Sequence, residues 1–206
     1  MHAKEHWEKI HSANAPDSVS WYQAHADLSL RMIRSTGISV SAAIVDVGGG
    51  ASTLVDDLLL AGYTNLSVLD LSASALNKAR RRLGAAAEMV NWVEADVTTA
   101  SLAVNAFDLW HDRAVFHFLT APEGRAAYVA SVLRSVNLGG HVIVATFAED
   151  GPTRCSGLPV IRYRADELHA EFGKPFSLVS QEREVHRTPA GAEQKFVYCR
   201  FRRNGS

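Results

Sequence analysis

The stretch 44–52 (IVDVGGGAS) joins a short β-branched run to three consecutive glycines, directly before a helical pattern. A strand, a glycine turn and a helix in this order are how an α/β sheet presents its backbone to a nucleotide-like ligand. Glycine at Gly48 and Gly50 permits φ values that other residues avoid and leaves no Cβ between the backbone and a ligand. The stretch therefore predicts a cofactor loop, with an ordinary strand-to-helix turn as the alternative.

The middle of the chain alternates short β-branched runs with helical patterns. This alternation is typical of βαβ units and predicts a doubly wound α/β fold with a mostly parallel sheet covered on both faces. Two runs near the end, 177–186 and 195–202, predict an antiparallel hairpin added to that sheet. The expected parallel strands are 43–47, 66–69, 89–94, 107–110 and 141–147, and the expected helices between them are 52–61, 72–83 and 122–136, the last followed by Gly139-Gly140.

The two ends of the chain show different patterns. An amphipathic turn over 5–10, a break, and a helix over 28–33 predict an N-terminal flap and a helix packed on the sheet. A long loop follows over 148–163, and residues 165–172 predict a further helix. We expect one domain over 1–206, made of the flap and helix (1–37), a cofactor-binding half (38–147), and a substrate loop, helix and hairpin (148–206).

Composition narrows the class of partner. A chain of 206 residues with 47% hydrophobic residues fits one domain, and a net charge of −1 disfavours nucleic acid, with Arg80-Arg81-Arg82 interpreted as the solvated face of a helix. Cys155 and Cys199 are too isolated for a disulfide framework or a zinc site, so we expect no metal. The sequence has no signal-like segment and no run of about 18 apolar residues, so we expect a cytoplasmic protein without membrane contact.

The residues around the glycine turn discriminate among ligands. The turn continues as Ala51-Ser52-Thr53, which lacks the lysine of a phosphate-binding Walker loop. Thr53 also stands where a dinucleotide fingerprint needs its third glycine, which makes NAD the second choice. Asp70 ends the next strand and is placed to accept hydrogen bonds from ribose hydroxyls, whereas Asp96 ends the third and is placed to accept from an adenine amine.

These acids have a joint consequence for charge. With Asp46, they make the carboxyl edge of the sheet acidic, which suits a ligand with a sulfonium and an ammonium and disfavours phosphates. Asp46 itself would brace the turn or reach the ammonium through water.

The motifs together resemble those of class I S-adenosylmethionine-dependent methyltransferases over about residues 40–202. The residues that carry the resemblance are Val45-Asp46-Val47-Gly48-Gly49-Gly50, Leu69-Asp70-Leu71-Ser72, Ala95-Asp96-Val97 and Phe107-Asp108-Leu109-Trp110-His111-Asp112-Arg113. The resemblance implies S-adenosyl-L-methionine as the cofactor and a seven-stranded, Rossmann-like sheet with a reversed terminal hairpin. The cofactor-binding residues expected are Trp7, Trp21, Asp46, Gly48, Gly50, Asp70, Leu71, Asp96, Val97 and His111.

A narrower resemblance concerns the segment after the fourth strand. Trp110-His111-Asp112-Arg113, followed by Pro122, Arg125 and Tyr128 and then by 146–152, is similar in order to thiopurine S-methyltransferases and their small bacterial relatives. Trp7 matches an N-terminal tryptophan that covers the cofactor in those proteins. His111 between Trp110 and Asp112 departs from their pattern. The opening from Trp7 to Trp21-Tyr22 is also similar to some protein-lysine methyltransferases, which leaves a protein acceptor open.

Methyl transfer is an in-line displacement, so an enzyme contributes mainly by positioning the acceptor and excluding water. We expect Asp112, Arg113 and His117 to be the catalytic residues, with His111 beside them, because groups that follow the fourth strand stand at the mouth of the crevice. Arg113 could hold an anionic group or lower the pKa of a thiol, or could form a structural ion pair. His117 could accept a proton, or could be a hydrogen-bonded packing residue.

The leading hypothesis is thus methyl transfer to a small nucleophile, a thiol or a related soft heteroatom. The alternatives are a protein-lysine methyltransferase of the same fold and a non-catalytic module that binds an adenosine ligand or NAD.

Overall fold

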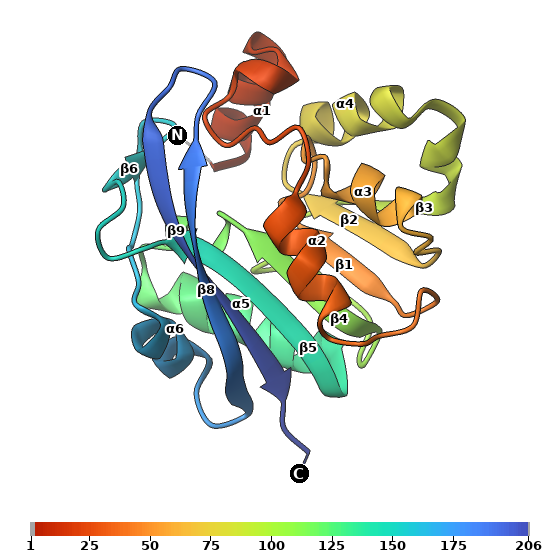
Figure 1. Ribbon diagram of the computed structural model, residues 1–206, viewed down its shortest axis with the longest axis vertical. Helices are drawn as coiled ribbons and strands as arrows, with labels where there is room; N and C mark the ends of the chain where they lie inside the picture. Colours follow the sequence, from red (N-terminus) through yellow and green to blue (C-terminus); the bar gives the residue numbers. More distant parts are fainter. Residues whose placement is uncertain (1–2, 206) are drawn as a thin grey trace.

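The computed structural model describes residues 3–205, and a single seven-stranded sheet runs through it (Figure 1). The strand order is β3-β2-β1-β4-β5-β9-β8. Neighbours among the first five strands are parallel, whereas β9 pairs antiparallel with both β5 and β8. The strands are β1 (Ile44–Val47), β2 (Leu66–Asp70), β3 (Val90–Glu94), β4 (Phe107–Arg113), β5 (Val136–Phe147), β8 (Phe176–Arg187) and β9 (Glu193–Arg203). The predicted fold class, a mostly parallel sheet with a C-terminal antiparallel hairpin, is confirmed.

Helices cover both faces of this sheet, and each face has its own apolar core. One core joins α2 (Asp27–Arg34), α3 (Leu54–Leu60) and α4 (Ala73–Leu83) to one set of strand side chains, such as Ile44 and Leu109. The other joins α5 (Pro122–Ser135) and α6 (Ala165–Phe172) to the alternate set, such as Val45 and Trp110. Side chains of a strand point to the two faces in turn, so these continuous apolar runs are what a sheet buried on both sides requires.

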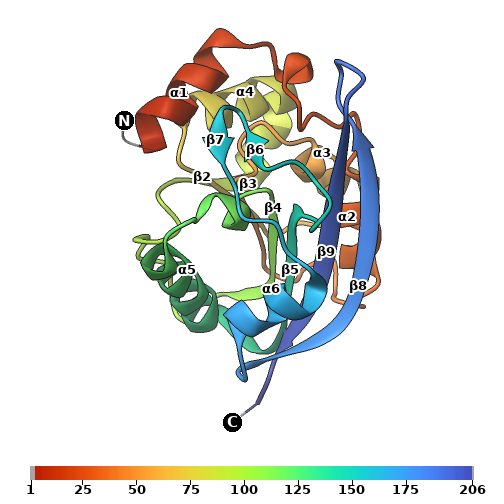
Figure 2. The ribbon, with the colours of Figure 1, turned by 90° about the vertical axis from the view of Figure 1, so that its left-hand side faces the viewer.

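The N-terminal segment lies across one end of the sheet rather than on a face. Helix α1 (Ala3–Ala13) is longer than the turn expected over 5–10, and it packs beside α4 (Figures 1 and 2). The short 3₁₀ turn η1 (Pro16–Ser18) then leads into α2. Glu8 accepts the backbone N–H of Ser74 at 3.3 Å, and Lys4 forms a 2.6 Å ion pair with Glu94. Polar contacts thus attach α1 to the ends of β3 and α4.

Two strands extend beyond their predicted limits. β4 continues from Trp110 to Arg113 because its register with β1 and β5 is unbroken there, pairing Asp112 with Val47 and Arg113 with Ala145. β5 begins at Val136, so Gly139-Gly140 lie inside a strand and not after a helix end. The register shift opposite Phe107 and the φ of +76° at Gly139 mark a bulge there. His111, Asp112 and Arg113 are therefore strand residues with alternating orientation.

The remaining connections contain only short elements or none. The segment 148–163, predicted as a loop, contains a small antiparallel pair, β6 (Arg154–Cys155) and β7 (Leu158–Pro159). Two further 3₁₀ turns are η2 (Gly84–Met89), before β3, and η3 (Phe116–Phe118), after β4. No helix crosses between β3 and β4 in the described chain, where residues 95–106 form a loop. Figure 2 shows β6 and β7 near α1, at the same end of the sheet.

Candidate active site

A cavity of about 260 Å³ lies at the carboxyl ends of β1, β2 and β4, beside the segment that follows β3. The glycine loop after β1 contributes Gly48, Gly49 and 51–54 to its wall. The N-terminal segment contributes residues from α1, from 16–26 and from α2, and β6 and β7 contribute Cys155 and Leu158. Ligands of open α/β sheets bind in this position, outside the carboxyl ends of the strands.

The three glycines of the loop are required by packing as well as by conformation. Gly48 has a φ of +68°, and a Cβ there would overlap Val115. A Cβ on Gly49 would lie 2.6 Å from Cγ of Asp46, and one on Gly50 would lie 2.7 Å from Oδ2 of Asp70. Gly50 was expected to contact the cofactor, but it does not line the cavity. Its N–H instead donates to Oδ2 of Asp70 at 3.0 Å, so it holds that carboxylate in place.

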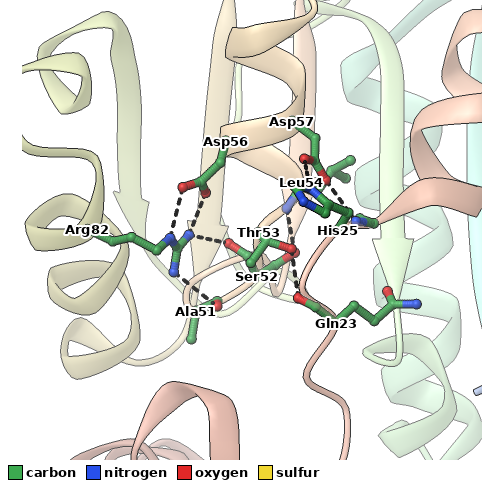
Figure 3. A network of polar contacts seen from close by, with 10 residues as sticks. Gln23, His25, Ala51, Ser52, Thr53, Leu54, Asp56, Asp57 and Arg82 are labelled. Carbon is green, nitrogen blue, oxygen red and sulfur yellow. Dashed lines mark hydrogen bonds and ion pairs between the residues drawn. The ribbon is translucent and has the colours of Figure 1, made fainter. Parts of the chain in front are cut away.

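The end of the glycine loop is fixed from two sides (Figure 3). On one side Arg82 forms a fork on Asp56, with Nε to Oδ1 at 2.9 Å and Nη2 to Oδ2 at 2.6 Å, and also donates to the carbonyl of Ser52. On the other side Thr53 Oγ1 donates to the carbonyl of Gln23 at 3.0 Å. Figure 3 also shows His25 beside Asp57, whose Oδ1 lies 2.8 Å from His25 Nδ1. The loop is therefore connected both to α4 and to the N-terminal segment.

One of the predicted acids, Asp70, ends strand β2, and another, Asp96, lies in the loop two residues after β3 ends. Asp70, at the end of β2, accepts the N–H of Ser72 with Oδ1 at 2.8 Å, in addition to the bond with Gly50. Burial raises the pKa of Asp70 to about 6, although these two donors oppose the rise. Asp96 is exposed, and its Oδ1 accepts from the N–H and the hydroxyl of Thr98 at 2.9 and 2.6 Å. Both acids line the cavity, as do the adjacent Leu71 and Val97.

A buried chain of hydrogen bonds links the third acid to α2. Asp46 Oδ1 lies 2.7 Å from Nδ1 of His111, and Nε2 of His111 lies 2.9 Å from the hydroxyl of Ser29. The parallel register places Asp46 beside His111, so the two side chains share one face of the sheet. All three residues line the cavity, and Asp46 Oδ2 is buried without a hydrogen-bond partner among residues 3–205.

Aromatic side chains close the cavity from the N-terminal side. Trp7 of α1 packs edge-on against Phe118 and Trp21, with ring centroids 5.0 and 5.9 Å apart. His11 lies 5.8 Å from Trp21, and burial lowers the pKa of His11 to about 4, which leaves the ring uncharged at neutral pH. All four line the cavity. The expected flap thus brings both predicted tryptophans, Trp7 and Trp21, to the cavity wall.

Arg113 lines the cavity, but its guanidinium is already engaged. Its Nε donates to the hydroxyl of Tyr198 at 2.8 Å, and its Nη2 lies 3.2 Å from Oε2 of Glu184. The group also lies 4.3 Å from the centre of the Phe196 ring and donates to the carbonyl of Trp21. Glu184 and Tyr198 raise the pKa of Arg113, against the effect of burial. The structural ion pair is therefore the interpretation of Arg113 that this geometry favours, and it attaches the flap to the sheet.

Two residues predicted to be catalytic, Asp112 and His117, do not line the cavity. Asp112 is fully buried, and its carboxylate accepts the N–H groups of Val115 and Phe116 and the hydroxyl of Tyr128, at 2.8, 3.0 and 2.6 Å. Its side chain points to the opposite face from His111, because adjacent strand residues alternate. Asp112 is thus the residue that holds the turn after β4.

His117 is likewise fully buried and absent from the cavity wall. Its Nδ1 accepts the N–H of Phe147 at 3.3 Å, and its ring lies 4.7 Å from that of Phe147. Burial and the charge of Arg113 lower the pKa of His117 to about 3, so the ring stays neutral at physiological pH. The packing interpretation of His117 is the one that this geometry favours.

Sequence reasoning missed Ser29, His11 and Arg82. Ser29 is a polar position on the apolar face of α2, between Leu28 and Met32, and that break in the pattern is a usable signal. Nothing in the sequence distinguishes Arg82 from Arg80 and Arg81 or shows that His11 faces the cavity. Among residues 3–205 no group of three or more metal-ligating side chains is present, and no helix is long and apolar enough to cross a membrane.

Comparison with known proteins shows which proteins this chain is similar to. Residues 44–140 match the family model described as "Methyltransferase domain". This part of the chain is therefore similar to a methyltransferase domain. A curated relative, the ubiquinone/menaquinone biosynthesis C-methyltransferase UbiE of Roseobacter denitrificans, is 32% identical over 109 residues, and the match covers 52% of this chain but only 42% of the relative.

Solved structures share the fold of this chain over nearly its whole length. A protein studied in the conversion of a disulfide bond into a thioacetal group during echinomycin biosynthesis has a TM-score of 0.78 at 20% identity, covering 98% of this chain and 93% of that one. The N-methyltransferase NodS of Bradyrhizobium japonicum, in complex with S-adenosyl-L-homocysteine, has a TM-score of 0.72 at 15% identity, with 98% and 99% covered. The 1,6-didemethyltoxoflavin-N1-methyltransferase of Burkholderia thailandensis has a TM-score of 0.68 at 19% identity, with 98% and 84% covered.

Proposed function

We propose that this chain is an S-adenosyl-L-methionine-dependent methyltransferase whose acceptor is a small molecule bound in the cavity under α1. The observation that carries the proposal is the buried, unpartnered oxygen of Asp46 in the wall of a cavity that also presents Asp70 and Asp96. A buried carboxylate oxygen without a donor is costly, and a cationic ligand group at this position would satisfy it.

Each carboxylate of the cavity wall fits one polar group of S-adenosylmethionine. Asp46 Oδ2 would accept from the ammonium, and Asp70 would accept from the ribose hydroxyls with the lone pairs that Gly50 and Ser72 leave free. Asp96 keeps Oδ2 free for the adenine amine, since its bonds to Thr98 use Oδ1. The cavity wall contributes three acids, and its arginine is paired with Glu184, so it suits a cation better than a phosphate.

The other predicted contacts complete this proposal. We assign cofactor contacts also to Gly48, Leu71, Val97, Trp7, Trp21 and His111, all of which line the cavity, with His111 acting through its bond to Asp46. When bound, the cofactor supplies an electrophilic methyl group on a sulfonium. The protein would exclude water with the aromatic group of Trp7, Trp21 and Phe118, and would hold the acceptor in line with the methyl group. Residues 38–147 would then serve as the cofactor-binding half and 148–206 as the acceptor half.

The side chains on the N-terminal side of the cavity, around Trp7, Trp21 and Phe118, favour an uncharged, partly apolar acceptor. The aromatic side chains there carry no charge, and His11 is neutral at physiological pH. Burial raises the pKa of the Cys155 thiol, which keeps it protonated, and Arg113 is balanced by Glu184. We retain a thiol or a related soft heteroatom as the preferred acceptor. The conversion of a disulfide into a thioacetal associated with one structural relative supports sulfur chemistry, although it concerns that protein.

A second acceptor class is favoured by a specific relative. The match to a C-methyltransferase over 109 residues supports an activated carbon, such as the ring carbon of a phenol, as the alternative site of methylation. A protein lysine is a third possibility that the same assay would detect.

The experiment is a cofactor-binding measurement followed by an acceptor screen. Isothermal titration should show S-adenosylhomocysteine binding to the full chain, and NAD should not compete. Methyl transfer from radiolabelled S-adenosylmethionine should then be screened against aryl thiols, phenols, amines and protein extract. Labelling of the small molecules with no labelling of protein is the expected result, whereas binding of NAD but not S-adenosylhomocysteine would refute the proposal.

A further inference from the structure

The hydrogen-bonded series Ser29–His111–Asp46 does more than join α2 to the sheet. Its three members come from α2, β4 and β1, and each residue is at least 97% buried yet contributes to the cavity wall. A purely structural tie between a helix and a sheet does not require its polar groups to face a ligand cavity. The order hydroxyl, imidazole, carboxylate is the order in which proteins pass a proton away from a reacting group.

The direction of each hydrogen bond follows from the chemistry of the groups. A carboxylate can only accept, so Nδ1 of His111 carries the proton that is donated to Asp46 Oδ1 at 2.7 Å. Nε2 of a neutral ring is then an acceptor, and the hydroxyl of Ser29 donates to it at 2.9 Å. The oxygen of Ser29 is left with lone pairs only, and it can accept a hydrogen bond from a group in the cavity.

Carboxylates lie near His111 on two strands. Asp46 faces it from β1, and the carboxylate of Asp112 follows it on β4. Arg113, which lines the same cavity, is held by Glu184 and by Tyr198, whose hydroxyl also lies near Ser29. The acids that would stabilise a bound sulfonium would thus also stabilise an imidazolium, in a region whose total charge stays constant during the reaction.

We propose that Ser29, His111 and Asp46 form a proton relay that deprotonates the methyl acceptor, an inference that rests on the proposed function. The acceptor's lone pair forms the new bond to the methyl carbon as the carbon–sulfonium bond breaks and its electron pair returns to sulfur. The acceptor's proton passes to the oxygen of Ser29 while the proton of Ser29 passes to Nε2 of His111. Asp46 balances the imidazolium, which later returns its proton to solvent.

This relay defines the acceptor class more closely. The acceptor must carry a proton on or conjugated to the methylated atom, as thiols, phenols and primary or secondary amines do. Thioethers and tertiary amines have no such proton and would not use the relay. Ser29 is the catalytic residue of the three because it alone contacts the acceptor, and His111 and Asp46 act through it.

The first test measures ionisation without methyl transfer. 4-Nitrophenol has different visible spectra as a phenol and as a phenolate, and it can be bound to the complex of the full chain with S-adenosylhomocysteine. The relay predicts that the bound probe ionises at a lower pH than the free probe, and that Ser29→Ala and His111→Gln abolish the difference. Ser135→Ala and His169→Gln are matched controls, because the Ser135 hydroxyl has no partner within residues 3–205 and His169 lies on α6, outside the cavity wall.

The second test measures rates with the acceptor found in the screen. Ser29→Ala and His111→Gln should lower kcat about 100-fold or more at neutral pH, as loss of a general base does. Ser29→Ala should do so with an unchanged affinity for S-adenosylhomocysteine. The deficit should shrink about tenfold for each unit of pH until the acceptor is ionised in solution, because the relay is then no longer needed. The two control variants should keep the wild-type profile.

The outcomes separate the relay from the proposed function. If the wild-type chain does not bind S-adenosylhomocysteine, the proposed function itself fails. If the cofactor product binds but the wild-type complex leaves 4-nitrophenol un-ionised or unbound, the relay is wrong. The relay is also wrong if both variants keep wild-type kcat, or if they lose the same factor at every pH together with stability, which is the signature of a structural tie.

Discussion

Replacement of Asp112 by alanine tests whether this residue has a structural role and not a catalytic one. Its carboxylate accepts three hydrogen bonds, from the N–H groups of Val115 and Phe116 and from the hydroxyl of Tyr128. None of its surface is exposed, and Tyr128 is equally buried. Asp112→Ala therefore leaves three donors without an acceptor in the core, at the turn that connects β4 to η3.

The expected loss of stability follows from the cost of each buried donor that has no acceptor. A buried donor without a partner costs about 1–3 kcal/mol, and partial entry of water brings the sum for three to about 4 kcal/mol. In a domain of this length 1 kcal/mol lowers Tm by about 2–4 °C, so we expect a decrease of about 8–16 °C. Asp112→Asn keeps one amide oxygen and should lose the equivalent of about one donor, near 2 kcal/mol.

Differential scanning fluorimetry and urea unfolding measure these losses, and Asp166→Ala serves as the control, since its side chain is 72% exposed on α6.

Burial raises the pKa of Asp112 to about 6 from an ordinary value of 3.8. Its ionisation therefore opposes folding, and its contribution is greatest below pH 3.8 and is lost as the pH rises to 6. The stability of wild type relative to Asp112→Asn should fall by roughly 3 kcal/mol across that window. Wild-type Tm in Asp112→Ala together with lost methyl transfer would refute the structural role.

Three further changes have distinct expected outcomes. Gly49→Ala should displace Asp46 from His111 and lower both Tm and the affinity for S-adenosylhomocysteine, by about 2 kcal/mol of stability in urea unfolding, and an unchanged affinity would contradict the geometry of the loop. Arg113→Gln should lower Tm and increase proteolysis of the segment 14–26, because the contacts of Arg113 with Trp21 and Glu184 are lost. A competition assay between acceptors should show that methylation of anionic acceptors does not fall more than that of uncharged ones, and a selective fall would contradict the structural ion pair. Trp7→Ala should raise KM for the cofactor with little change in Tm, and equal kinetics for variant and wild type would exclude a cover over the cavity.

The sequence predicts the elements of this fold well because their signals are local. Alternating β-branched and amphipathic runs predicted the order of strands and helices, and α6 was predicted with its exact limits, 165–172. The errors occur where pairing with a distant strand overrides a local signal for the end of an element. Gly139-Gly140 is a typical signal for the end of a helix, yet pairing with β4 draws it into β5 as a bulge.

The site was less predictable because strand length decides which side chains face it. With β4 ending at Trp110, His111, Asp112 and Arg113 would all lie in a loop near the cavity. The strand instead continues, so alternation sends His111 and Arg113 to one face and Asp112 to the other. Partners from distant segments decide the rest. The register between β1 and β4 places His111 beside Asp46, and Ser29 of α2 contacts that histidine. Glu184 of β8 forms an ion pair with Arg113. The local sequence predicts neither contact.

The most direct test of the account is the affinity for S-adenosylhomocysteine of the wild-type chain and of Asp70→Ala, measured by isothermal titration calorimetry. Asp70 would provide two charge-assisted hydrogen bonds to the ribose, so its loss should weaken binding about 100-fold. Because burial raises the pKa of Asp70 to about 6, wild-type affinity should also fall as the pH drops below 6, and the variant should show no such dependence. Binding to the wild-type chain that the Asp70→Ala substitution leaves unchanged, or no binding at all, would contradict the assignment of this cavity.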